Sequence, residues 1–269
     1  MERMSLDALC GALAYAMGIE KPDKAAAPCG TLCQYVDKAF DGKKIDRLFM
    51  YNPDAIGRWI YKKYAAYMRE AIAMTDIEIP FDTVMPSVTP VCFGTMYTGA
   101  QPAVHGIRSY TKPVIKIDTF FDALLRAGKR AVILGDASCS LMHIFLERDM
   151  EYIASDTEAE TLARAAELIA QDEYDAIICY NGNYDSVMHK FGPESPEALA
   201  ELRSNSQGFA MLQTLIRSYW KQHDTLMGFA MDHGCHEIDG GCGSHGLDMP
   251  EDIEITHLYQ AIPAVQKRS

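Results

Sequence analysis

The chain has 269 residues, 48% of them hydrophobic and 23% charged, which is enough for one large globular domain or two small ones. Its formal net charge is −12, from 37 acidic and 25 basic residues, and this balance argues against binding to nucleic-acid polymers or anionic membranes. No apolar run reaches transmembrane length, and eight irregularly spaced cysteines suit free thiols in a reducing cytoplasm.

The N-terminal part predicts one helix followed by a linker. Residues 9–19 (LCGALAYAMGI) are typical of an amphipathic helix, with Ser5 as its cap. The stretch at 20–31, EKPDKAAAPCGT, is linker-like. We therefore expect a single catalytic domain over residues 1–269, with 1–45 as an N-terminal helical extension.

The main body alternates apolar runs with helical patterns. Strands are predicted at 47–52, 130–136, 175–181 and 225–232, and helices at 57–74, 120–129, 157–171 and 195–222. Continuous apolar strands separated by helices indicate an α/β three-layer sandwich with a central, mostly parallel sheet and helices on both faces. In such sheets, ligands bind beyond the carboxyl ends of the strands.

Aspartate and histidine stand at the ends of three of these strands. The first strand leads into Asp54, the third into Asp185 and His189, and the fourth into Asp232 and His233, with His245 after a glycine-rich loop. Asp185 and His189 are four residues apart and share one face of a helix, and Gly234 allows the sharp turn that both Asp232 and His233 need. Three carboxylates and three imidazoles are enough for two zinc-like ions.

The stretch MPSVTPVCFGTMYTGAQPAVHGI, residues 85–107, is rich in hydroxyls and turn formers but poor in charge. We interpret it as a nucleophile loop, with Thr89 at the start of a helix whose N–H groups favour an anion. A metal would lower the pKa of the Thr89 hydroxyl, and two metals would stabilise an in-line displacement at phosphorus. The pairs Cys29/Cys33 and Cys235/Cys242 are weaker candidates for metal ligands.

Four blocks in order resemble the alkaline phosphatase superfamily, and most of all its type I phosphodiesterase / nucleotide pyrophosphatase branch. Thr89 precedes Thr98-Gly99 by nine residues, which favours it over the rival nucleophile Ser87, and the run from Pro102 to Ile107 (PAVHGI) follows. The run from Asp185 to Pro193 (DSVMHKFGP), then Asp-His-Gly at 232–234 and His-Gly at 245–246, complete the pattern. The resemblance spans residues 54–246.

The resemblance implies a ligand set and a reaction. Asp54, Thr89, Asp232 and His233 would hold one divalent metal, and Asp185, His189 and His245 the other; zinc is the usual ion, with manganese as the alternative. Thr89 would be the nucleophile on a small phosphorylated substrate, a phosphodiester or a nucleotide pyrophosphate, in a monomer or a homo-oligomer.

Two departures from the branch bear on specificity. Tyr110 falls where the nucleotide pyrophosphatases have a phosphoryl-binding asparagine, and Asp54-Ala55 replaces the usual Asp-Gly. A phosphomonoesterase or phosphonate hydrolase is therefore the first alternative, and a phosphomutase would need a further domain. A catalytically inactive metal-binding protein is the non-enzyme alternative.

Overall fold

An eight-stranded sheet forms the centre of the protein, whose computed structural model describes residues 3–265. The strand order is β1-β3-β10-β7-β2-β6-β4-β5. The strands are β1 (Met4–Ser5), β2 (Arg47–Pro53), β3 (Ile77–Asp82), β4 (Ala131–Asp136), β5 (Glu151–Ser155), β6 (Ala176–Asn181), β7 (Thr225–Phe229) and β10 (Glu254–Ile262). Only β10 is antiparallel to its neighbours, so the sheet is mostly parallel, as predicted.

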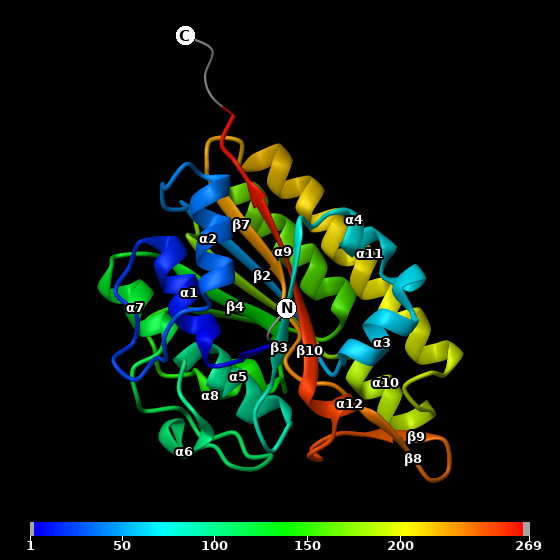
Figure 1. Cartoon of the computed structure of the whole chain (residues 1–269). Coiled ribbons are helices and arrows are strands. Elements are labelled where there is room, and N and C mark those ends of the chain that lie inside the picture. Colours follow the sequence, from blue (N-terminus) through cyan, green and yellow to red (C-terminus); the bar gives the residue numbers. More distant parts are fainter. Residues whose placement is uncertain (1–2, 266–269) are drawn as a thin grey trace.

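Helices cover both faces of this sheet (Figure 1). One layer comprises α1 (Ala8–Met17), α2 (Gly30–Ala39), α5 (Thr89–Thr98), α6 (Pro102–His105), α7 (Phe120–Arg126) and α8 (Ser140–Ile144). The other comprises α3 (Arg58–Lys63), α4 (Arg69–Ala73), α9 (Glu158–Gln171), α10 (Asn183–Phe191) and α11 (Pro196–Tyr219). The predicted three-layer α/β sandwich is confirmed.

The remaining elements lie near the carboxyl edge of the sheet. They are a separate hairpin of β8 (His236–Ile238) and β9 (Cys242–Ser244), and the short helix α12 (Pro250–Ile253). Among the residues that the structure describes, no helix combines the length and the apolar character needed to cross a membrane.

The four predicted strands are all present and set the position of the site. β2 lies between β6 and β7, and its register pairs Asn52 with Tyr180 and Pro53 with Asn181. Because these strands are parallel, the segments that follow them leave the sheet at the same edge. The residues predicted at the strand ends are therefore neighbours in space.

The N-terminal helix differs from its prediction in cap and in character. Asp7 is the N-cap of α1, whereas Ser5 pairs with Asp82 in the sheet. The helix is buried on nearly all sides and so is not amphipathic, since it packs inside the layer that also contains α2, α5 and α7. The apolar run at 9–19 is explained by burial on all sides.

The helix predicted at 57–74 is broken into α3, a 3₁₀ turn (Ala65–Tyr67) and α4. The sequence here contains no proline or internal glycine, so local propensity does not cause the break. The Ala71 N–H donates to the Ser206 hydroxyl of α11 at 2.9 Å, and α3 packs against β10. Packing against two different elements bends the segment.

Candidate metal centre

Two groups of aspartate and histidine meet at the carboxyl edge of the sheet. The first contains Asp54, Asp232 and His233, all fully buried, and the second contains Asp185, His189 and His245. Within each group the candidate ligand atoms lie within 4.8 Å of one another. All six residues had been predicted as metal ligands, and the structure brings them together in the two sets that the resemblance implies.

The first group surrounds the Thr89 hydroxyl. The Nε2 atom of His233 is 3.3 Å from Asp54 Oδ1 and 3.3 Å from Asp232 Oδ2. The hydroxyl oxygen of Thr89 is 3.3 Å from His233 Nε2 and 3.5 Å from Asp54 Oδ1. Thr89 is the first residue of α5, as predicted, so the N-terminus of that helix faces the same point.

The second group comes from α10, which carries Asp185 and His189, and from the segment after β9, which carries His245. Asp185 and His189 are one helical turn apart, and His189 Nε2 lies 3.2 Å from Asp185 Oδ1. His245 brings its own Nε2 to 3.4 Å from the same oxygen. The rings of His233 and His245 are 4.2 Å apart between centroids, so the two groups are adjacent.

Backbone carbonyls fix the tautomer of all three histidines. The Nδ1 atom lies 2.9 Å from the Gly243 oxygen in His189, 2.9 Å from the Gly234 oxygen in His233, and 3.0 Å from the Ser87 oxygen in His245. A carbonyl oxygen only accepts, so each Nδ1 carries a proton and donates it. Each Nε2 therefore directs a lone pair at the carboxylates, which is the arrangement of metal-ligating histidines.

A cation is needed to hold these acceptors together. Asp185 Oδ1 and Asp232 Oδ2 are buried and have no hydrogen-bond donor among residues 3–265. Burial, with the negative charges of Asp232 and Asp185, raises the pKa of Asp54 well above its usual range. Burial likewise raises the pKa of Asp232, and the neighbouring Asp185 carboxylate, 3.2 Å from Nε2, raises the pKa of His189. Both groups therefore suit a bound cation, which would satisfy the acceptors that burial leaves unpaired.

The spacing of the ligand atoms fits divalent metals. Two ligands of a tetrahedral zinc ion, each about 2.0–2.1 Å from the metal, lie about 3.4 Å apart. The nitrogen-to-oxygen distances in both groups are 3.2–3.4 Å. Imidazole with carboxylate is a donor set that suits zinc and, with more oxygen, manganese.

Close packing explains the glycine after His233. A Cβ at Gly234 would lie 2.0 Å from the Glu251 carbonyl oxygen and 2.8 Å from the Cα of Gly57. Its φ is not left-handed, so the prediction that Gly234 serves a sharp turn is wrong, and close approach of the backbone is the reason. Ala55 carries the strained conformation instead, with φ of 62°, and its N–H donates to Asp232 Oδ1 at 3.2 Å.

A buried contact between a histidine and a carboxylate, which the sequence did not reveal, holds the segment bearing His245. His236 Nδ1 lies 2.7 Å from Asp252 Oδ1, while Asp252 Oδ2 accepts from the Leu247 N–H at 2.9 Å. The Asp252 carbonyl also accepts from the Gly234 N–H at 2.8 Å. Asp252 thus contacts both ends of the hairpin, and its partner His236 is buried.

Tyr180 is a further contact of the site that sequence reasoning missed. Its phenol donates to Asp54 Oδ2 at 2.5 Å from the end of β6, and burial raises the pKa of Tyr180, so the phenol stays protonated. A tyrosine in an apolar strand looks like core, and only the register with β2 reveals its partner.

The other candidates fall outside the two ligand groups. Tyr110 is 59% exposed and lines a cavity together with Asp54 and Asp185. The Ser87 side chain is buried with no hydrogen-bond partner among the described residues, whereas its carbonyl holds His245. Neither group contains a cysteine, and Asp136 caps a turn by accepting from the Ser138 N–H at 2.8 Å.

The mostly parallel sheet, with the candidate centre at its carboxyl edge, gives the protein an alkaline phosphatase-like α/β fold. The resemblance seen in the sequence is thus confirmed at the level of the fold. No family model and no curated protein matches the chain in sequence. Solved structures do match it.

Murine ectonucleotide pyrophosphatase / phosphodiesterase 5 matches with a TM-score of 0.58 at 15% identity, over 72% of this chain and 58% of that one. Its inactive variant, in which a threonine is replaced by alanine, was solved with AMP and gives a TM-score of 0.57. Phosphonoacetate hydrolase from Sinorhizobium meliloti 1021, solved in complex with phosphonoformate, matches with a TM-score of 0.55 at 18% identity, over 76% of this chain and 61% of that one. The chain thus spans less than two thirds of these proteins.

Proposed function

We propose that this protein is a metal-dependent hydrolase of phosphoric esters that acts through Thr89 with two divalent cations, most favourably zinc. The observation that carries the proposal is the pair of adjacent Asp/His groups, with ligand atoms 3.2–3.4 Å apart, the first of which contacts the Thr89 hydroxyl. The structural neighbours support it, since they are a pyrophosphatase/phosphodiesterase solved with AMP and a phosphonate hydrolase.

The metals supply the electrostatics of the site. Asp54, Asp232 and His233, with the Thr89 hydroxyl, would hold one cation, and Asp185, His189 and His245 the other. When bound, the two cations lower the pKa of the hydroxyl and neutralise charge on the phosphoryl oxygens.

The residues of this chain divide the reaction into two displacements. In the first, Thr89 Oγ1 gives its proton to solvent and forms a bond to phosphorus, while the bond from phosphorus to the ester oxygen breaks and that oxygen takes a proton from solvent. In the second, a water oxygen forms a bond to phosphorus and gives one proton to solvent, while the bond from phosphorus to Oγ1 breaks and Oγ1 regains a proton. The N-terminus of α5 stabilises the anion at this position because its first N–H groups carry partial positive charge.

Phosphodiesters and nucleotide pyrophosphates are the proposed substrates, as the resemblance implies, and phosphomonoesters or phosphonates are the alternative. The inactive threonine-to-alanine variant of the murine neighbour supports a threonine nucleophile. The net charge of −12 favours a small substrate, such as a nucleotide, over a nucleic-acid polymer. The completeness of both ligand groups argues against an inactive protein.

One paired experiment tests this proposal. The metal content of the purified protein is measured, and hydrolysis of bis(4-nitrophenyl) phosphate is compared with that of 4-nitrophenyl phosphate. We expect Thr89→Ala to lower kcat by about a thousandfold or more, because the nucleophile is removed. Thr214→Ala, at an exposed position of α11, serves as the matched control. Unchanged turnover in Thr89→Ala would refute the assignment of the nucleophile.

A further inference from the structure

A cavity of about 280 Å³ adjoins the candidate metal centre on one side. Asp54 and Asp185 belong both to its wall and to the ligand groups. The rest of the wall comes from the ends of β4 and β6, from the start of α9, and from the segment that carries Tyr110. A substrate whose phosphorus lies at Thr89 can therefore direct one substituent into this cavity. Its volume is at the lower end of small-molecule sites, so that substituent is compact.

The wall of this cavity carries an excess of negative charge beyond the metal ligands. Asp136, Asp156 and Glu158 contribute three carboxylates, and Lys112 is the only basic residue, which leaves a net charge of −2. Within residues 3–265, none of the three carboxylates has an ion-pair partner.

The hydrogen-bond partners of Asp136 and Glu158 do not neutralise the negative charge of these carboxylates. Asp136 accepts from the Ser138 N–H at 2.8 Å and Glu158 from the Asn183 amide at 2.6 Å, both neutral donors. Lys112 donates to the Ser138 carbonyl at 2.6 Å. The unpaired carboxylates raise the energy of an anionic substituent and lower that of a cationic one.

Two tyrosine rings complete the wall. Tyr180 is buried at the end of β6, and Tyr110 is exposed. The face of a tyrosine ring attracts an ammonium group within about 6 Å. The Lys112 ammonium lies 5.7 Å from the centroid of the Tyr110 ring, so one ring of this wall already makes a contact of this kind.

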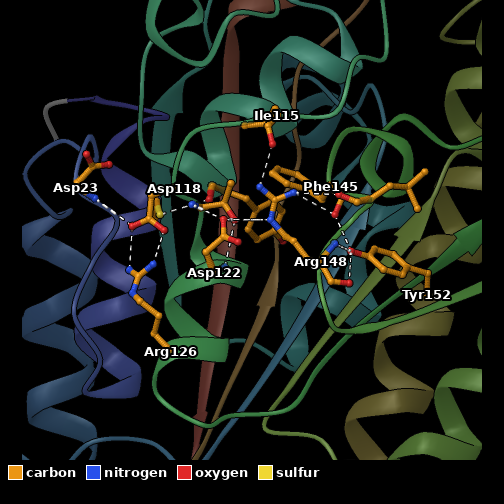
Figure 2. Close-up of polar contacts among 12 residues, drawn as sticks. Asp23, Ile115, Asp118, Asp122, Arg126, Phe145, Arg148 and Tyr152 are labelled. Atoms are coloured by element: carbon orange, nitrogen blue, oxygen red, sulfur yellow. Dashed lines mark hydrogen bonds and ion pairs between the residues drawn. The ribbon is translucent and has the colours of Figure 1, made fainter.

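The segment that carries Tyr110 and Lys112 is anchored at its far end. Figure 2 shows the Arg148 guanidinium between the Ile115 carbonyl, at 3.1 Å, and the Asp122 carboxylate, at 3.1 Å. Arg148 also donates to the Phe145 carbonyl at 3.2 Å, and the Ile115 N–H donates to the Ile144 carbonyl at 2.8 Å. These contacts join the segment to α7 and α8, so the position of this wall is set before a substrate binds.

We propose that this cavity selects phosphodiesters in which one substituent carries an ammonium group, that is, diesters of amino alcohols. The inference rests on the proposed hydrolase function and deepens it. The carboxylates and the tyrosine rings recognise the cation, while the phosphorus lies at Thr89. Substrates that carry further phosphate groups into the cavity, such as nucleoside polyphosphates, are disfavoured because the wall repels them.

Two isosteric esters test the inference with the metal-loaded, full-length protein. One is 4-nitrophenyl phosphocholine, and the other is 4-nitrophenyl 3,3-dimethylbutyl phosphate, in which carbon replaces the quaternary nitrogen. Both release 4-nitrophenol, so kcat/KM is measured in the same way. We expect the choline ester to be preferred by about tenfold or more at low salt, and the preference to shrink as salt is added.

Variants that neutralise single carboxylates test whether the preference for the choline ester arises from this cavity. Asp156→Asn, at an exposed position of the cavity rim, should lower the ratio of the two kcat/KM values severalfold. Glu173→Gln, an exposed change just before β6 at the opposite edge of the sheet, should leave the ratio unchanged.

Equal kcat/KM values for the two esters would overturn the charge selectivity while leaving the hydrolase function intact. A preference for the 4-nitrophenyl ester of thymidine 5′-phosphate over the choline ester would also overturn it, in favour of a nucleotide. Absence of turnover with every ester, after zinc or manganese is supplied, would refute the proposed function and the inference with it.

Discussion

His189 and His245, which are 56 residues apart in the chain, place their Nε2 atoms 3.1 Å from each other beside the same oxygen of Asp185. Each ring has its Nδ1 proton committed to a backbone carbonyl, of Gly243 for His189 and of Ser87 for His245. Two lone pairs and a carboxylate repel one another at this distance unless a cation lies between them. The fold therefore brings the two histidines and Asp185 into an arrangement that suits a bound cation.

Removal of one ligand group should remove one metal. We expect about two metals per chain in the intact protein, and about one in His245→Ala and in Asp232→Asn, because each substitution breaks a different group. His223→Ala, which changes a histidine paired with Asp172 away from this centre, should keep both metals. Elemental analysis of each purified variant, with circular dichroism as a check on folding, measures this. Two metals retained in both ligand variants would contradict the assignment.

The sequence could predict which residues meet at the candidate site because most of them follow three of the four predicted strands. Runs such as Ala176–Asn181 are buried throughout and apolar up to the last residues, and a parallel sheet brings the segments after them to one edge. The assignment of Asp54, Asp185 and Asp232 needed only the ends of those strands. Thr89 needed the resemblance as well, since Ser87 lies two residues away and is also buried.

The elements that the sequence did not predict owe their form to tertiary contacts. β10 carries buried polar residues, and His257 and Gln260 interrupt the apolar pattern of a strand. The Gln213 amide of α11 donates to Gln260, so a side chain far away in the sequence makes that burial favourable. β3 contains Pro80, which also weakens the strand signal.

The carboxylate of Asp252 should control the affinity of the second metal. It accepts from His236 and from the Leu247 N–H, and Asn at this position provides only one acceptor oxygen. We expect Asp252→Asn to lower the affinity for that metal by about ten- to a hundredfold, because loss of the contacts that support metal ligands has an effect of this size. Asp239→Asn, in the exposed turn of the same hairpin, is the control. Competition with a chelator measures the affinity, and equal values for the two variants would refute the prediction.

The phenol of Tyr110 should act as a hydrogen-bond donor to the substrate. The O–H group is protonated at neutral pH, because a tyrosine phenol ordinarily has a pKa of about 10. We expect Tyr110→Phe to lower kcat/KM on bis(4-nitrophenyl) phosphate by about tenfold, the value of one hydrogen bond to a charged group. Tyr219→Phe, at an exposed position of α11, should have no effect. If Tyr110→Phe retains full activity and Tyr110→Ala does not, the ring and not the hydroxyl is used.

The buried imidazole of His257 should make the protein sensitive to mild acid. Burial lowers the pKa of His257 to about 4, from about 6.5 in an unfolded chain. Its Nε2–H donates to the Met231 carbonyl at 2.7 Å, and its Nδ1 lies 3.0 Å from the Tyr259 hydroxyl, so the neutral ring fits both partners. Because the folded pKa is depressed, the stability that the neutral ring contributes is fully present above pH 6.5 and is lost as the pH falls towards 4.

The size of this effect follows from the shift. About 1.4 kcal/mol per pKa unit gives a loss of about 3 kcal/mol in the free energy of unfolding between pH 7 and pH 4, before other groups are counted. Urea unfolding at a series of pH values measures it. We expect His257→Gln to be less stable than the intact chain at pH 7 but to lose less stability on acidification, whereas His223→Gln should keep the steep dependence. Parallel curves for the intact chain and for His257→Gln would show that another group causes the acid sensitivity.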